Sequence, residues 1–343
     1  MSPLKRNPGK RPTAAAVAKL AGVSTTTVSF VLNNRLGAGI PKSTQDIVLA
    51  AAKQLGYRPN LLARSLATGT TNTMGFWITR LSAMVYFTWV EYLQEEVQSH
   101  GYELIISERG KDASDSEKIP SSSPEWPVDG LFAYGPWVSQ YLKRNHVHTP
   151  TVVIGPYPAE GVDFVGVTFL KAEIEAVEHL IKGGRKRIVY VHCPPHPSLK
   201  DARLDGYLEA MEQAGLAHEV FQIPGVSRSQ GYQSMTEYLH SRSYPEACVC
   251  LNDDIAIGVM RALKEVGLRV PEDVAVIGSD GLEDTYYHQP RISTISIPFA
   301  DIAANAWRFM SNRLKDPSIP LQTAVWEARF LRRESSAPLI PYE

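Results

Sequence analysis

The sequence predicts a mixed α and α/β protein with a small all-α head and a larger body built on parallel sheets. The first observation is a charge asymmetry. Of the chain's 35 Lys+Arg and 36 Asp+Glu, residues 1–69 hold ten bases and the single acid Asp46, which leaves 25 bases and 35 acids for the other 274 residues. The second is that short apolar runs alternate with amphipathic segments from about residue 73 onward. At 343 residues, two or three domains are expected.

The segment TAAAVAKLAGVSTTTVSFVLNN, residues 13–34, predicts two short helices joined by a tight turn. Thr13 can cap the first helix, Gly22 is placed to end it, and Ser24 can cap the second. Apolar residues at helical spacing supply the two buried faces: Val17, Leu20 and Ala21, then Val28, Val31 and Leu32. This pattern is typical of a helix-turn-helix.

The second helix leaves Thr25, Thr26, Ser29 and Phe30 on or near its outer face. In helix-turn-helix motifs the early residues of that helix meet base edges in the major groove of DNA. A basic disordered tail is the alternative for the charged head, but such tails lack periodic apolar residues. The head is therefore interpreted as a DNA-binding module.

A third helix is predicted for residues 42–55, with Pro41 before its first turn and Gly56 at its end. Its expected inner stripe is Ile47, Val48, Ala51 and Leu55. Residues 57–69, YRPNLLARSLATG, then predict a helix that Asn60 can cap and that carries Leu62, Ala63 and Leu66. Because this helix is too short to be stable alone, it is expected to form only against a partner or DNA.

In the body, strands are expected at TMGFWI, YELIIS, DGLFAY, TVVIG, RIVYVH, EVFQI, ACVCL and VAVIGSD. Helices are expected near residues 86–100, 170–182, 201–214, 229–241, 254–266 and 299–314. Alternating strands and helices favour parallel sheets covered on both faces, and about 270 residues favour two lobes with a cleft. Ligands of such sheets bind at the carboxyl ends of the strands.

The motifs AGVSTTTVSFVLN, GYRPN, NLLARSLATGTTNTMGF, DARLDGYLEAMEQAGL and CLNDDIAIGVMRALKEVGLRVPEDVAVIGSDG together resemble the LacI/GalR family of bacterial transcriptional regulators. The resemblance covers nearly the whole chain. It implies a headpiece at 1–58, a hinge helix and linker at 59–70, and a two-lobed core like that of periplasmic binding proteins at 71–343. The implied lobes are about 71–184 with 297–325, and 185–296 with 326–343, and the chain is expected to cross between them near 183–187, 295–298 and 323–328.

The resemblance also implies the functional residues. Leu66 matches a hinge leucine that wedges into the minor groove at the operator centre. Arg203, Asn252 and Asp280 match residues that contact a small polar effector, and either Tyr86 or Phe87 matches an aromatic contact. The chain departs from the family pattern at Phe30, where an arginine is usual, at Thr168 and Phe169, where Asp-Asn is common, and at Gly281, where a second acid often stands.

The implied function is a sequence-specific DNA-binding regulator, usually a repressor, that works as a homodimer in the cytoplasm under the control of an effector. A solute-binding or sugar-modifying protein on the same core is the alternative, which the basic head disfavours. No enzymatic activity, cofactor, metal or membrane span is expected. Cys248 and Cys250 fit a buried strand better than a metal site, and His192, Cys193 and His196 fit a structural or pocket-lining role.

Overall fold

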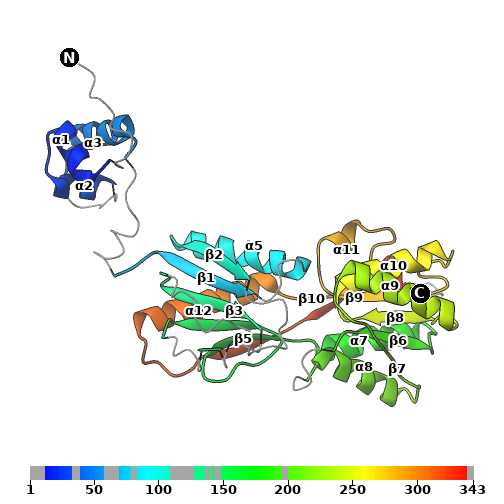
Figure 1. Cartoon of the computed structure of the whole chain (residues 1–343). Coiled ribbons are helices and arrows are strands. Elements are labelled where there is room, and N and C mark those ends of the chain that lie inside the picture. Colours follow the sequence, from blue (N-terminus) through cyan, green and yellow to red (C-terminus); the bar gives the residue numbers. More distant parts are fainter. Residues whose placement is uncertain are drawn as a thin grey trace. The chain divides into compact units, whose positions relative to one another are not determined.

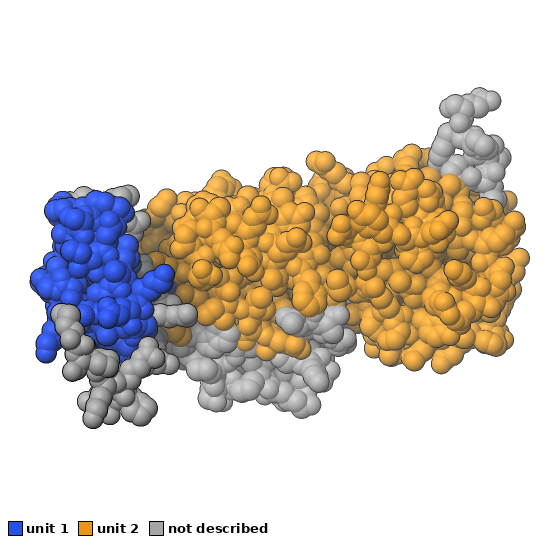
Figure 2. All heavy atoms as spheres, turned by 90° about the horizontal axis from the view of Figure 1, so that it is seen from above, with its two compact units in different colours: residues 1–71 blue, residues 72–343 orange. Residues whose placement is uncertain are grey.

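The computed structural model describes residues 12–32, 39–57, 69–78, 83–108, 127–135, 138, 141–142, 148–194 and 200–337. The chain divides into two compact units, residues 1–71 and 72–343, which Figure 2 colours separately. Each unit is described by itself. The division falls next to the predicted linker.

The described residues of the first unit form three helices, α1 (Ala14–Ala21), α2 (Thr25–Leu32) and α3 (Lys42–Leu55), as Figure 1 shows. The Thr13 hydroxyl accepts from the Ala16 amide at 3.3 Å, and Gly22 ends α1 with a φ of +67°. The Ser24 hydroxyl accepts from the Thr27 amide at 3.0 Å and so caps α2. The chain bends by 103° between α1 and α2, an angle typical of helix-turn-helix motifs.

The core of this unit is small and is shared by all three helices. Its buried members are Val17, Ala18, Val28, Val48, Ala51 and Ala52. Two residues assigned to this core from the sequence lie outside it, because Leu20 is 39% and Ile47 is 52% exposed. In α3 the buried face runs through Val48, Ala51 and Ala52, which rotates the inner stripe away from Ile47.

The second unit contains two six-stranded sheets (Figure 1). The first has the order β11-β5-β4-β3-β1-β2 and is parallel throughout. Its strands are β1 (Thr73–Ile78), β2 (Glu103–Glu108), β3 (Gly130–Tyr134), β4 (Thr151–Gly155), β5 (Asp163–Thr168) and β11 (Thr323–Glu327). One face is covered by α5 (Met84–Ser99) and α12 (Phe299–Lys315), which also pack against each other.

The second sheet has the order β12-β10-β9-β8-β6-β7, and only β12 runs antiparallel to its neighbour. Its strands are β6 (Ile188–His192), β7 (Glu219–Gln222), β8 (Ala247–Cys250), β9 (Ala275–Asp280), β10 (Ser293–Ser296) and β12 (Arg329–Leu331). Its helices are α7 (Leu170–Lys182), α8 (Ala202–Gln213), α9 (Arg228–Ser241), α10 (Asp253–Glu265) and α11 (Asp284–Tyr287), and a short 3₁₀ turn spans Glu334–Ser336.

The eight strands and six helices expected in the body are all present, with ends shifted by two residues at most. Four strands were not predicted: β5, β10, β11 and β12. Two of these lie at sheet edges, where alternate side chains are exposed and the apolar run is broken, as in β11 with Val325 58% exposed. The segment after β5 then leads directly into α7.

The chain passes between the two lobes at Phe169, at Ile297–Pro298 and at Ala328. The first crossing was predicted near 183–187 and is wrong by about one helix, because α7 packs on α8, β10 and β12 of the second lobe. The second and third crossings lie within the expected ranges. Phe169, Ile297 and Ala328 are buried members of one apolar cluster that runs through both lobes. The crossings therefore belong to the core of the body.

Candidate functional sites

The outer face of α2 is the candidate DNA-contacting surface. Thr25, Thr26 and Ser29 are exposed there, while Val28 is completely buried against α1 and α3. Burial of Val28 fixes the rotation of α2 and so directs these hydroxyl side chains away from the core. Hydroxyl groups can both donate to and accept from base edges and phosphates.

Phe30 is half-buried on α2, between the exposed face and the core. A ring in this position keeps part of its edge open to a partner, which suits apolar contact with a thymine methyl group. Asn60 and Leu66 of the predicted hinge helix lie outside the described residues.

The candidate effector site is a cluster of buried polar residues at the carboxyl ends of β3, β6 and β9. Arg203, near the start of α8, has a side chain that is 10% exposed. Its Nη2 donates to Asp280 Oδ1 at 3.3 Å, and its guanidinium carbon lies 3.8 Å from the centre of the Phe169 ring. The two predicted site residues Arg203 and Asp280 therefore lie in contact, and Phe169 from the first crossing packs against Arg203.

Asp280 ends β9 in a strained backbone conformation, with a φ of +118°. Such strain in a residue other than glycine is retained where surrounding contacts enforce it, and it is common at binding sites. Burial raises the pKa of the Asp280 carboxyl to about 7, although the nearby Arg203 acts to lower it. For Arg203, burial opposes the charge, but Asp280 and Asp201 raise the pKa of the guanidinium overall.

The backbone and the surroundings of Gly281 explain why glycine stands where the family pattern often has an acid. Its φ is +81°, and a Cβ there would lie 2.4 Å from the Ser296 hydroxyl and 2.8 Å from the Ser296 Cα. Its amide donates to Asp253 Oδ2 at 2.8 Å, and the Leu282 amide donates to the same oxygen at 2.7 Å. The loop after β9 is therefore anchored to the start of α10, with no room for a side chain at this position.

The structure distinguishes the two aromatic candidates on α5. The Tyr86 ring lies 5.1 Å from the Tyr134 ring in an edge-to-face arrangement, and Tyr134 is itself electrostatically coupled to Arg203 and Asp280. Phe87 is 48% exposed and lines a different groove with residues 281–284. Tyr86 thus belongs to the cluster and Phe87 does not.

Asn252, which was predicted to contact the effector, is the N-cap of α10. Its Oδ1 accepts from the Ile255 amide at 2.8 Å and caps α10, and its Nδ2 donates to the Val226 carbonyl at 3.0 Å. Asp254, in the first turn of α10, accepts from Arg228 Nε at 2.7 Å. The amide of Asn252 is therefore committed at both ends within the protein.

Three members of the cluster were missed as site residues by sequence reasoning, Phe169, Tyr190 and Asp201, and His192 was given a structural or pocket-lining role. His192 Nδ1 lies 3.8 Å from Asp201 Oδ2, too far for a hydrogen bond, and both residues are buried. Burial lowers the pKa of His192, although Asp201 acts to raise it. Asp201 caps α8 by accepting from the Arg203 amide at 3.1 Å. The sequence signal for Asp201 was its position at the start of the DARLDGY motif, directly before the first residue of α8.

Cys248 and Cys250 are buried on β8, and burial raises the pKa of the Cys248 thiol to about 12. Their interpretation as strand residues is confirmed. His192 lies in the inter-lobe cluster, whereas His196 lies outside the described residues. Within the described ranges no group of His, Cys, Asp and Glu is arranged to hold a metal ion.

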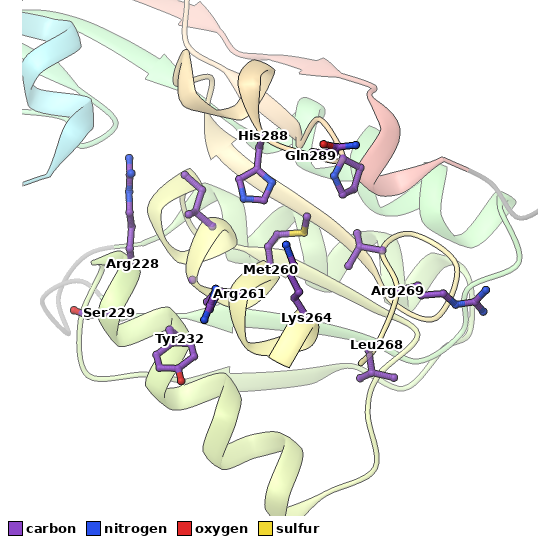
Figure 3. A pocket seen from close by; sticks show the side chains of 14 residues that line it. Arg228, Ser229, Tyr232, Met260, Arg261, Lys264, Leu268, Arg269, His288 and Gln289 are labelled. Carbon is purple, nitrogen blue, oxygen red and sulfur yellow. The ribbon is translucent and has the colours of Figure 1, made fainter. Parts of the chain in front are cut away.

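A separate pocket of about 720 Å³ lies on the second lobe, between α9, α10 and the segment after α11 (Figure 3). Its apolar floor includes Ile257, Met260, Leu268, Val270 and Pro290. Lys264 extends toward Met260 and His288, whereas Arg269 points away from the pocket (Figure 3). Arg269 pairs with Asp273 at 2.9 Å.

No single helix among the described residues is long and apolar enough to cross a membrane. The bent pair α1 and α2 passes that test together, by length and composition only.

Residues 15–60 match the family described as bacterial regulatory proteins, lacI family, and residues 177–336 match a periplasmic binding protein-like domain. The chain is 32% identical over 287 residues to the HTH-type transcriptional repressor PurR of Haemophilus influenzae strain PittEE, covering 81% of this chain and 84% of that one. It is 30% identical over 339 residues to PurR of Proteus mirabilis strain HI4320, covering 95% and 98%. The chain belongs to the LacI family of bacterial regulatory proteins, so the predicted family is confirmed.

Solved structures agree with the predicted fold. A lac repressor dimer bound to operator and the anti-inducer ONPF aligns with a TM-score of 0.79 at 22% identity, covering 95% of this chain and 99% of that one. The transcriptional regulator CelR in complex with cellobiose aligns with a TM-score of 0.66 at 25% identity, covering 95% and 100%. The helix-turn-helix head and the two-lobed core with parallel sheets are thereby confirmed.

Proposed function

We propose that this protein is a transcriptional repressor that binds operator DNA in the cytoplasm and responds to a small effector held between the lobes of its body. The observation that carries the proposal is the combination of two sites in one chain. The head presents hydroxyl side chains from a capped helix in a basic segment, and the body encloses a buried polar cluster around Arg203 and Asp280. The repressors PurR and the operator-bound lac repressor are relatives with this organisation.

DNA binding rests on the head and on the hinge. Thr25, Thr26, Ser29 and Phe30 read bases in the major groove, and the hinge residues Asn60 and Leu66, assigned from the family resemblance, act at the minor groove. Basic residues of the head neutralise phosphates and release counterions, so binding weakens steeply as salt rises.

Effector binding rests on the cluster at the lobe boundary. Arg203 and Asp280 come from the second lobe, and Tyr86 and Tyr134 come from the first. A ligand that contacts both sets favours one arrangement of the lobes over another, which is the energetic requirement for control by a ligand. Asn252 supports this site by fixing the start of α10.

A homodimer is part of this proposal, because two heads are needed to read a two-fold operator. The body offers a surface for it, along the edge formed by α5, β2 and α11 in Figure 1. Large apolar side chains are exposed on these elements: Met84, Phe87, Ile105, Ile106, Tyr286 and Tyr287. A groove of about 640 Å³ between the start of α5 and residues 281–284, and the pocket of Figure 3 beyond α11, continue this surface.

The deciding experiment is selection of operator sequences from random DNA with the full chain, followed by gel-shift titration across salt concentrations. The full chain is expected to enrich a two-fold symmetric site and to lose affinity as salt rises. A body of residues 72–343, which is one compact unit, is expected to bind no operator. Tight operator binding by this body, or failure of the full chain to enrich any site, would reject the proposal.

Effector control is tested with Arg203→Ala in the same titration, with and without a metabolite panel. We expect operator affinity without ligand to stay nearly unchanged and the response to ligand to disappear. Loss of ligand contacts removes the bias between two states without removing the states. An unchanged ligand response would remove Arg203 from the site.

A further inference from the structure

Several polar atoms in the inter-lobe cluster are buried without a hydrogen-bond partner among the described residues. They are Asp201 Oδ2, Tyr190 OH, His192 Nδ1, Arg203 Nε and Glu173 Oε1. All five residues are at most 8% exposed. A buried polar atom without a partner costs on the order of 1–3 kcal/mol, and such atoms are rare in native proteins. Their concentration around one arginine indicates that a ligand completes their hydrogen bonds.

The charges of the cluster do not balance. The guanidinium of Arg203 is electrostatically coupled to both Asp280 and Asp201. Burial lowers the pKa of His192, which disfavours its cationic form, and raises the pKa of Glu173 well above its ordinary value, which disfavours its anionic form. Above about pH 7, one cation therefore faces two carboxylates, and a ligand anion would add to the excess negative charge.

Arg203 is already committed within the protein. One face of its guanidinium is covered by Phe169 at 3.8 Å, and its Nη2 donates to Asp280 at 3.3 Å. Phe169 is 1% exposed and stands where the family pattern often has a polar residue, so the arginine is less available for a ligand carboxylate or hydroxyl pair. Asp201 Oδ2 lies 3.8 Å from His192 Nδ1 and accepts no hydrogen bond among the described residues, so this carboxylate oxygen is left for a ligand.

We infer that the effector carries a protonated amine, which pairs with Asp201 at the boundary between the lobes. This inference rests on the proposed function and specifies its ligand class. Tyr134, Tyr157 and Tyr86 contribute aromatic rings on the first-lobe side, and the phenols of Tyr134 and Tyr157 stay uncharged because burial raises their pKa, for Tyr157 to about 12. Aromatic faces attract cations, most strongly where water is excluded.

The test compares ligands that differ only in charge. The full chain is titrated calorimetrically at pH 8 with 6-amino-6-deoxyglucose, glucose and glucuronate, and with cyclohexylmethylamine, cyclohexylmethanol and cyclohexanecarboxylate. We expect at least one amine to bind, at least tenfold tighter than its neutral and anionic counterparts. Asp201→Asn should weaken that amine tenfold or more. Asparagine caps helices as well as aspartate does, so the start of α8 is preserved.

Asp205→Asn is the matched control, since Asp205 is an exposed aspartate one turn further along α8, and it should bind the amine as the unchanged protein does. Three outcomes would overturn the inference: no binding by any ligand, equal or tighter binding of a neutral or anionic member, or unchanged amine binding in Asp201→Asn. Operator selection by the same samples distinguishes failure of the amine inference from failure of the proposed function. A chain that selects an operator but shows no amine preference rejects only this inference, whereas a chain that selects none rejects the proposed function.

Discussion

At the scale of single residues, Phe30 is proposed to shape the operator preference, because it stands where the family pattern usually has an arginine. An arginine at this place could bond a guanine through two donors, whereas a phenyl ring offers apolar contact only. Phe30 is partly exposed on α2, so part of its ring can contact DNA.

We therefore expect Phe30→Ala to change base preference at one position in each half-site. A base contact contributes about 1–3 kcal/mol, which is large enough to alter a preference profile. The measurement is operator selection with the variant and the unchanged protein in parallel. Identical profiles would show that Phe30 serves packing alone.

The raised pKa of the Asp280 carboxyl predicts that the stability of the body depends on pH. Its pKa is about 7 in the folded body, against an ordinary 3.8, because burial penalises the carboxylate. The charged groups that face it are Arg203 on α8 and Asp253 and Asp254 on α10. Between about pH 4 and 7 the folded state keeps a proton that the unfolded state has lost, so the free energy of unfolding falls as pH rises through that window.

Asp280→Asn cannot titrate and should lose this dependence. The free energy of unfolding of the variant, minus that of the unchanged protein, is expected to be roughly 2–3 kcal/mol higher at pH 8 than at pH 5. This figure follows from about 1.4 kcal/mol for each pKa unit. Urea unfolding at the two pH values measures it. Parallel pH profiles for the two proteins would contradict the assignment of a raised pKa to Asp280.

At the scale of elements, α2 and the predicted hinge helix at residues 59–70 are proposed to have different tasks in DNA binding. The caps of α1 and α2 are local, through Thr13 and Ser24, and the core of the head needs only its own three helices. The helix predicted around Leu66 is too short to be stable alone, so we expect it to fold only against DNA or a partner.

Leu66→Ala is expected to weaken specific operator binding much more than binding to random DNA. The apolar wedge compensates for unstacking at the operator centre, while the phosphate contacts are unaffected by the change. Gel-shift titrations with operator and with random DNA of equal length give the ratio. If both affinities fell equally, or neither changed, the wedge assignment would have to be abandoned.

At the scale of the whole molecule, the proposed function requires the body to couple its lobes and to present a face to a second copy. Coupling is built into the core, because Phe169, Ile297 and Ala328 lie at the crossings and pack in one cluster. The exposed edge of α5, β2 and α11 is the proposed dimer face, and Tyr287, at 75% exposed, is its most exposed large side chain.

Tyr287→Glu is expected to weaken dimerisation at least tenfold, since a charge would be buried in an apolar contact. Analytical ultracentrifugation over a concentration series measures the dissociation constant. Tyr244→Glu is the control, because Tyr244 is also exposed, at 53%, but lies between α9 and β8, away from the proposed face. Equal dimer dissociation constants for Tyr287→Glu and the unchanged protein would show that Tyr287 does not lie in the dimer interface.

The sequence by itself determined the helix-turn-helix, the alternation of strands and helices in the body, and the choice of Arg203 and Asp280 as site residues. The first two depend on local signals, namely caps, glycines and apolar periodicity, which are visible over ten to twenty residues. Arg203 and Asp280 were each chosen because a motif around them matches a family residue by residue, and their contact with each other was not predicted. None of these needed knowledge of how distant segments pack.

Tertiary structure alone decided which neighbours surround that pair. Phe169, Tyr190 and Asp201 come from a crossing, a strand and a helix start that are adjacent only after the sheet has formed. Likewise Tyr86 and Phe87 are equivalent in sequence, and only the packing of α5 turns the first toward Tyr134 and leaves the second exposed. Burial and electrostatic coupling depend on segments far apart in the chain, so no local pattern can encode them.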